Sequence, residues 1–91
     1  MNFEWDSKKA AVNLKKHGVS FHEAAMIFSD PFSITSHDPD HSAVEHRFIT
    51  VGLDQFRRVL IVSHTDRGET IRIISARSTT RQERKYYEEG K

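Results

Sequence analysis

Short apolar patterns with capping residues between them run through the first third of the chain. Apolar side chains recur at helical spacing up to His17, and Asp6 ahead of them is a typical N-cap, so this segment is predicted to be a helix. Gly18 follows, and a glycine there suits the left-handed backbone that often closes a helix. The stripe predicted to be buried consists of Ala10, Ala11 and Leu14.

A second short helix is predicted immediately afterwards. Ser20 and Glu23 have the spacing of a capping box. Asp30 and Pro31 are expected to end this helix, because proline lacks the backbone donor that a helix needs. Its apolar stripe consists of Phe21, Ala24, Ala25 and Phe28.

The second half of the chain has the alternation typical of β-strands. Runs at residues 47–53, 58–65 and 70–77 are separated by polar loops, which predicts an antiparallel meander. Phe3 and Trp5 are compatible with a short first strand, and residues 32–36 with another. Together with the helices, these strands predict an α+β fold in one domain that spans residues 1–91.

A last short helix is predicted from the spacing of Thr79 and Gln82, which is again that of a capping box. The hairpin before it determines which side chains share a face of the sheet. If Arg67 and Gly68 form a two-residue loop, one face carries His64, Arg58 and Arg77. The other face then carries Ser63, Thr65 and Arg72, and a shift of one residue in the pairing would exchange the two sets.

Composition narrows the class of protein. The chain is 36% hydrophobic and has nine aromatic residues, enough for a modest core, and it has no cysteine for disulfides or thiolate metal sites. Its apolar runs are too short for a membrane span, and its start lacks the pattern of a signal peptide. We therefore expect a cytoplasmic protein with no membrane association.

Charge is unevenly placed along the chain. Residues 1–46 have a net charge of −3 and residues 47–91 a net charge of +4, and all eight arginines lie in the second half. The planar guanidinium group matches two phosphate oxygens at once, so this enrichment indicates a polyanionic partner. The alternative is a solubilising surface that complements the acidic half of the chain.

Several blocks, in the same order over nearly the whole chain, resemble the BrnT family of toxins from type II toxin–antitoxin systems. The most specific are KHGVSF at residues 16–21 and IRIISAR at residues 71–77, accompanied by FEWD at 3–6, FSDP at 28–31, EHR at 45–47 and ER at 83–84. The resemblance implies a RelE-like fold and cleavage of mRNA that arrests translation. It also implies neutralisation by a BrnA-like antitoxin, in a complex that binds operator DNA and represses its own operon.

Cleavage of RNA without a metal needs a base for the ribose 2′-OH, an acid for the leaving oxygen and cations for the developing charge. Arg77 is the first candidate for the phosphate clamp because it precedes a predicted helix N-terminus; a salt bridge to Glu45 or Glu83 is the alternative. Arg72 and Arg47, on neighbouring predicted strands, are further clamps. His64 is the candidate acid or base, and His46 or Glu45 could take that role instead.

Other residues are candidates for holding the RNA. Arg84 and Arg67 are predicted to contact its backbone, and Tyr87 or Tyr86 to stack on a base, although tyrosines at helical spacing more often pack against a sheet. His17, in the last turn of a helix, is interpreted as structural. We expect no cofactor. The residues of metal-binding type in the polar segment that contains Pro39 are His37, Asp38, Asp40, His41 and Glu45, and a solvated loop is the favoured interpretation.

Two other functions are compatible with the sequence. The first is an inactive relative that binds an antitoxin and helps it to hold operator DNA, with its arginines touching phosphates only. The second is a metal-dependent hydrolase built on the histidine-rich loop. The binding module would cause neither growth arrest nor RNA cleavage, and the hydrolase would lose its activity in a chelator.

Overall fold

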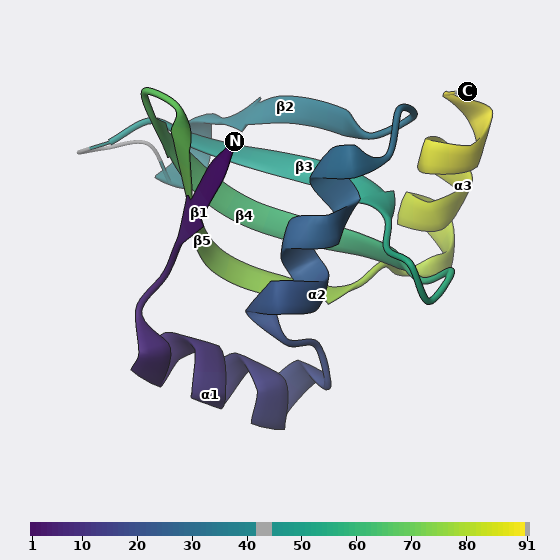
Figure 1. Cartoon of the computed structure of the whole chain (residues 1–91). Helices are drawn as coiled ribbons and strands as arrows, with labels where there is room; N and C mark the ends of the chain where they lie inside the picture. The colour runs from purple at the N-terminus through teal and green to yellow at the C-terminus, as the bar shows by residue number, and fades with distance from the viewer. Residues whose placement is uncertain (42–44, 91) are drawn as a thin grey trace.

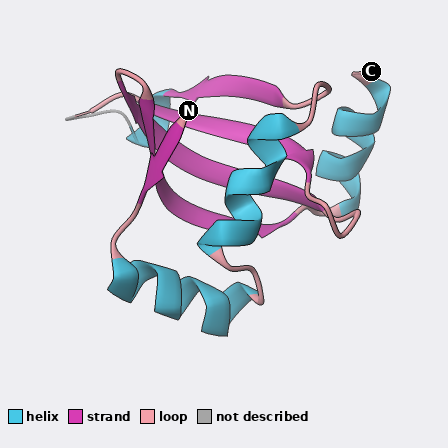
Figure 2. Cartoon of the chain, viewed as in Figure 1, coloured by secondary structure: helices cyan, strands magenta, loops and turns pink. Residues whose placement is uncertain are grey.

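A computed structural model describes residues 1–41 and 45–90 of the chain. Its five strands form one sheet in the order β1-β5-β4-β3-β2 (Figures 1 and 2). The strands are β1 (Asn2–Glu4), β2 (Ile34–Asp38), β3 (Arg47–Leu53), β4 (Val59–Arg67) and β5 (Thr70–Ser78). The helices are α1 (Ser7–His17), α2 (Phe21–Ala25) and α3 (Arg81–Glu89), with 3-10 turns η1 (Met26–Ser29) and η2 (Pro39–His41).

The sheet is mostly the predicted meander. Strands β2 to β5 pair antiparallel, each with its neighbour in the chain, and β1 adds to the outer edge of β5 in the parallel direction. The α+β class is therefore confirmed. None of the helices in the described ranges is both long and apolar enough to cross a membrane.

Local capping determines where α1 and α2 begin. The Asp6 carboxylate accepts hydrogen bonds from the backbone of Lys8 and Lys9, and Gly18 closes α1 with φ of 69°. Ser20 and Glu23 form the predicted capping box at the start of α2. The helix is short, because the chain continues as the 3-10 turn η1 up to Ser29.

The sheet has two different faces. The covered face packs against α1, α2 and η1 around the main core, whose buried members are Val19, Phe21, Ala24, Ile27, Leu60, Val62, Ile73 and Ala76. On the open face, α3 packs Tyr87 onto a second, smaller core with Val51, Val59, Leu53 and Ile61.

The predicted buried stripe of α1 is wrong in two of its three positions. Leu14 is 50% exposed and Ala11 is also exposed, whereas Asn13 is buried. The Asn13 amide donates to the Ala76 and Val19 carbonyls and accepts from the Ala76 N–H. It therefore satisfies the hydrogen-bonding groups of Ala76 at the outer edge of β5. A polar residue is buried here because it completes an unpaired strand edge.

The predicted hairpin loop is also wrong by one residue. Arg67 pairs with Thr70, so the two-residue loop is Gly68–Glu69, with φ of 63° at Gly68. His64 pairs with Ile73 while Ser63 pairs with Ser75, which leaves Ile74 as an extra residue in β5. His64 and Arg58 therefore share the covered face as predicted, but Arg77 lies on the open face with Thr65 and Arg72, so its predicted face is wrong.

Two further boundaries differ from the prediction by one or two residues. The capping box of α3 is formed by Thr80 and Glu83 and not by Thr79 and Gln82. Strand β2 spans Ile34–Asp38, two residues later than the predicted strand, so part of the predicted exposed loop is in the sheet. Residues 42–44 of that predicted loop lie outside the described ranges.

Candidate functional site

A row of charged side chains crosses the open face of the sheet at one level. Arg47 pairs with Thr65, and Thr65 pairs with Arg72, so these three residues of β3, β4 and β5 are direct neighbours on one face. Asp38 of β2 and Glu4 of β1 extend the row at its two ends. We call these five residues the arginine row. It brings together two of the predicted phosphate clamps, Arg47 and Arg72.

The cations around this row are partly balanced by acids. Nη1 of Arg72 lies 3.6 Å from a Glu4 carboxylate oxygen, and Nη1 of Arg67 lies 3.5 Å from the same oxygen. Arg67 also binds Glu45 through two hydrogen bonds of 2.9 and 3.2 Å, which lower the pKa of Glu45 below its usual value. Arg67 is thus exposed at the hairpin end and already engaged with protein carboxylates, and these exposed pairs are weak in water.

The Thr65 hydroxyl lies between the two arginines of the row. The residue is buried, and its oxygen makes no hydrogen bond within 3.5 Å, although it is close enough to Glu45 to contribute slightly to the lowered pKa of that carboxyl. The centre of the arginine row is therefore closed to solvent at Thr65, and the accessible donors of the row are its two guanidinium groups.

A groove of about 490 Å³ lies next to the row, between the sheet and α3. Its floor is apolar and comes from β3 and β4, with Ile49, Val51 and Ile61. Its walls are polar and come from β2 and α3, with Ser36, His37, Asp38, Thr80, Gln82, Glu83 and Tyr86. An apolar floor with polar walls can hold a nucleobase against the sheet while its sugar and phosphate remain at the rim.

Arg77 lies at the end of β5 beside this groove, just before α3 as predicted. Its guanidinium group donates two hydrogen bonds of 2.8 and 2.9 Å to Glu83, so the alternative salt bridge is present. These bonds hold the pKa of Glu83 at about 2, because they favour the carboxylate more than burial opposes it. The Arg77 side chain remains 42% exposed, so the pair is open to a ligand from the solvent side.

His64 lies in the core and not at this surface. It is 1% exposed, its Nε2 is 2.7 Å from the Thr50 hydroxyl and its Nδ1 is 2.8 Å from Asp66. Burial lowers its pKa below the usual value, although Asp66 opposes this shift. Because His64 is on the covered face, it cannot touch a phosphate held by Arg77 on the open face.

A different pair of imidazoles lies at the sheet edge, on the side of the covered face. Nε2 of His37 is 3.2 Å from Nδ1 of His46, and the His37 ring packs on Phe48, whose own ring stacks on His64. Both residues are exposed. The sequence pointed to His46 as an alternative base, but it interpreted His37 only as part of a solvated loop. The pairing became visible only once β2 and β3 were placed side by side.

The two tyrosines of α3 have different surroundings. Tyr87 is 2% exposed, and its hydroxyl donates to Asp30, so it has no ring face for an RNA base, which corrects the prediction of stacking. Burial raises its pKa to about 12. Tyr86 is 58% exposed and lines the groove. Arg84 is exposed on another side of α3, in a separate groove.

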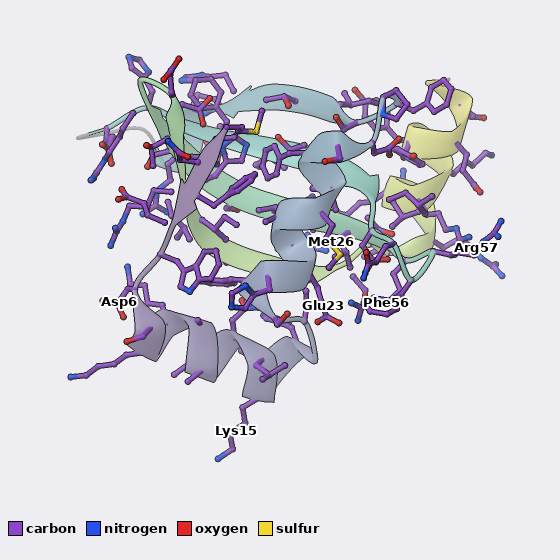
Figure 3. All side chains as sticks on the ribbon, in the orientation of Figure 1. Asp6, Lys15, Glu23, Met26, Phe56 and Arg57 are labelled. Carbon is purple, nitrogen blue, oxygen red and sulfur yellow. The ribbon has the colours of Figure 1, made fainter. Side chains whose placement is uncertain are left out.

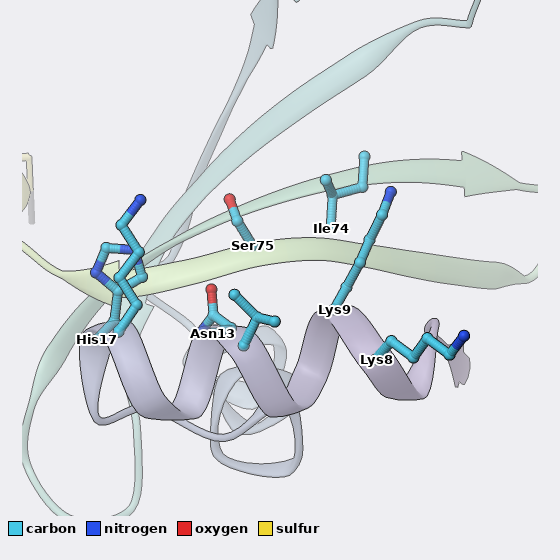
Figure 4. A pocket seen from close by; sticks show the side chains of 8 residues that line it. Lys8, Lys9, Asn13, His17, Ile74 and Ser75 are labelled. Atoms are coloured by element: carbon cyan, nitrogen blue, oxygen red, sulfur yellow. The ribbon is translucent and has the colours of Figure 1, made fainter.

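A further groove, of about 350 Å³, lies between α1 and the edge of β5 (Figure 4). It is lined by Lys8, Lys9, Val12, Asn13, Lys16, His17, Ile74 and Ser75. His17 is exposed in the last turn of α1 and belongs to this surface, apart from the arginine row. Within residues 1–41 and 45–90, no three His, Asp or Glu side chains are grouped so that they could hold a metal ion.

Comparison with known proteins identifies the family. Residues 5–83 match the family model described as ribonuclease toxin, BrnT, of type II toxin–antitoxin system. The chain belongs to the BrnT family. The 1.1 Å crystal structure of the Brucella abortus ribonuclease toxin BrnT is similar in fold, with a TM-score of 0.65 and 24% identity over 89% of this chain and 99% of that one. No curated protein matches the chain.

Membership of the BrnT family supports a toxin role and ribonuclease activity in general, and it implies an antitoxin as partner. The structural likeness supports the fold: a five-stranded sheet with three helices. The roles of individual residues in this BrnT protein rest on the geometry described above.

Proposed function

We propose that this BrnT protein is a metal-independent endoribonuclease that cleaves mRNA in the cytoplasm on the open face of its sheet and thereby inhibits translation. The observation that carries the proposal is the gathering of Arg47, Arg72 and Arg77 on that one face, beside a groove with an apolar floor and polar walls. We also propose that the fold is RelE-like and that a BrnA-like antitoxin neutralises the toxin. Operator DNA would then be bound only through the toxin–antitoxin complex.

The proposed chemistry uses side chains of this face only. The Glu45 carboxylate, which binds Arg67 and lies near Thr65 of the row, takes the proton of the ribose 2′-OH, whose oxygen attacks the neighbouring phosphorus. The bond to the 5′-oxygen breaks, and a water molecule gives that oxygen a proton. The products are a 2′,3′-cyclic phosphate and a 5′-hydroxyl.

The arginines stabilise the charge that develops on the phosphate. Arg47 and Arg72 face the same side of the sheet, one strand apart on either side of Thr65, so a phosphate above the row can accept from both guanidinium groups. Arg77 lies at the groove end and is assigned to the same phosphate or to a second one. To bind it, the Arg77 guanidinium group must replace a hydrogen bond to Glu83 with one to a phosphate oxygen. Tyr86 offers an exposed ring for a base in the groove. His64, as a core residue, is assigned to positioning β3 against β4.

Expression in a bacterial host without antitoxin tests the proposal. Wild type should arrest growth and produce new mRNA ends in primer extension, and Arg72→Ala and Arg47→Ala should each reduce cleavage by about 10²- to 10³-fold. Lys15→Ala is the matched control, because it also removes one cation but lies on α1 and points away from the sheet (Figure 3). Circular dichroism of the purified variants checks their folding. Undiminished cleavage by both arginine variants would remove the row from the site.

Two variants separate the possible roles of Arg77. Arg77→Lys keeps a charge but loses the two-pronged contact, and Glu83→Gln removes the carboxylate that competes for the guanidinium group. If Arg77 binds RNA, Arg77→Lys lowers cleavage and Glu83→Gln leaves it equal or higher. If the pair is only structural, both variants lower thermal stability while the cleavage rate per folded molecule stays constant.

The pairing of Arg77 with Glu83 also favours a second function. An arginine that is already neutralised by a carboxylate fits a surface that binds a partner without catalysis. The second candidate function is therefore an inactive module that joins an antitoxin on operator DNA. In that case wild type would cause no arrest and no new mRNA ends. It would still form a stable complex with the antitoxin, and the complex would shift operator DNA in a gel.

A further inference from the structure

The loop between β3 and β4 places a charged residue in a strained backbone position. Arg57 N–H donates to the Asp54 carbonyl at 3.2 Å and Asp54 N–H to the Arg58 carbonyl at 2.9 Å, which defines a three-residue hairpin loop. The last residue of such a loop adopts the left-handed conformation and is usually glycine. Here it is Arg57, with φ of 66°, the one non-glycine residue with positive φ in the described ranges.

The Arg57 side chain is not what holds this loop together. The Asp54 carboxylate does so, by accepting hydrogen bonds from the backbone of Phe56 and Arg58 and from the Arg58 side chain. In the part of the chain that the structure describes, the Arg57 side chain makes no hydrogen bond or salt bridge. The strained backbone is therefore not offset by any such contact of the Arg57 side chain within the loop, which indicates that this side chain has a role outside the loop.

Arg57 opens onto a groove of about 410 Å³ between this loop and the start of α3, and Figure 3 shows its side chain projecting outward there. Arg81 and Arg84 of α3 line the same groove, and both are exposed. The remaining lining comes from Arg58, Val59, Ser78, Thr79 and Thr80. Thr80 also lines the groove beside the arginine row, so the two grooves meet at the start of α3.

We propose that Arg57, Arg81 and Arg84 bind the phosphodiester backbone of the RNA strand where it leaves the cleavage site. This inference rests on the proposed ribonuclease function. Three planar guanidinium groups with hydroxyl neighbours match phosphate oxygens. An acidic peptide would also need an apolar anchor, but among the described residues that line this groove the apolar one, Val59, is buried.

The key experiment is Arg57→Gly, because it moves stability and RNA binding in opposite directions. Glycine relieves the left-handed strain, so the melting temperature should rise, by about 2–5 °C after the added flexibility of the unfolded chain is counted. Binding to a single-stranded 2′-O-methyl RNA, which cannot be cleaved because it lacks the 2′-OH nucleophile, should weaken about three- to tenfold. The slope of log K against log salt should fall by about 0.7 for each lost phosphate contact.

Arg81→Ala and Arg84→Ala should weaken RNA binding and reduce its salt dependence to the same extent as Arg57→Gly. With cleavable RNA, both should raise KM and leave kcat unchanged. Lys85→Ala is the matched control: it removes one cation from α3, but Lys85 does not line the groove, so its binding should stay within about twofold of wild type. Arg57→Gly with wild-type affinity and slope would overturn the inference. A lower melting temperature of Arg57→Gly would also overturn it, because Arg57 would then be needed by the loop.

Three outcomes separate this inference from the proposed function. If wild type cleaves RNA but the three arginine variants bind it as tightly as wild type, only the groove assignment fails. If those variants keep RNA binding but escape neutralisation by the antitoxin, the groove binds an acidic protein segment, which also overturns the inference. If wild type neither binds nor cleaves RNA, both proposals fail.

Discussion

His64 shows how one buried residue links the two central strands to solvent pH. Its ring touches Phe28 and stacks on Phe48, and its two nitrogens join Thr50 of β3 and Asp66 of β4. Thr50 in turn bonds Thr35 of β2. The neutral ring satisfies these partners within the core, whereas a charged ring would lose its hydration there.

We therefore expect the protein to lose stability as the pH falls below 6.5. The pKa of His64 is lower in the folded state than its unfolded value of 6.5, so the unfolded chain binds the proton first as the pH falls. The contribution of neutral His64 to the free energy of unfolding is therefore complete above pH 6.5 and declines below it. Urea unfolding at pH 7 and pH 5 measures the difference. His64→Asn should be less stable at pH 7 but lose less on acidification, whereas the exposed His17→Asn should behave like wild type. Equal acid sensitivity of His64→Asn and wild type would contradict this account.

At the scale of single elements, α1 depends on one amide more than on its apolar residues. The helix presents Val12 and Leu14 to solvent, while Asn13 completes the edge of β5 at Ala76. Beyond the three residues paired with β1, this amide acts in place of a neighbouring strand. The position of α1 is therefore set by backbone hydrogen bonds.

Asn13→Leu should consequently destabilise the fold, although it replaces a polar residue with a good helix former. It leaves the N–H and C=O of Ala76 without a partner at a buried edge, at a cost of about 2–4 kcal/mol. Chemical unfolding monitored by circular dichroism gives this value. Leu14→Asn, at the exposed neighbouring position, should change stability by less than about 1 kcal/mol. A stable Asn13→Leu protein would show that α1 is held by other contacts.

The same elements show what sequence can predict and where it stops. Helix starts at Asp6 and Ser20 and the strand Arg47–Leu53 were predicted correctly, because caps and alternation are local. The burial of Asn13 and the extra residue Ile74 in β5 depend on neighbours far along the chain, so the stripe of α1 and the face of Arg77 were predicted wrongly.

The candidate site divides in the same way. The importance of the arginines could be inferred from composition, whereas their common face depends on strand register. The strained backbone of Arg57 depends on the loop geometry, which leaves no clear pattern in the sequence.

At the scale of the whole molecule, one sheet supports two cores. The main core lies under α1, α2 and η1, and the smaller one, around Tyr87, lies on the opposite face under α3. Adjacent residues of β4 belong to different cores, since Val59 packs under α3 and Leu60 under α2 and η1. The Tyr87 hydroxyl further ties α3 to Asp30, at the end of η1, and Asp30 also binds the Leu53 backbone.

This arrangement predicts that α3 and the rest of the domain unfold together. Val59→Ala removes apolar volume from the smaller core and should cost about 1–3 kcal/mol. The fluorescence of Trp5, which packs on Phe21 at the main core, should report the whole of that loss in urea unfolding, with an unchanged m value. Circular dichroism should give the same urea midpoint for Val59→Ala as the fluorescence does. Leu60→Ala, in the main core, should also lower the midpoint, again with a single transition.

If Val59→Ala instead left the Trp5 midpoint unchanged while helix signal was lost earlier, α3 would be a separate unit. The groove wall formed by Glu83 and Tyr86 could then open without unfolding the sheet that carries the arginines.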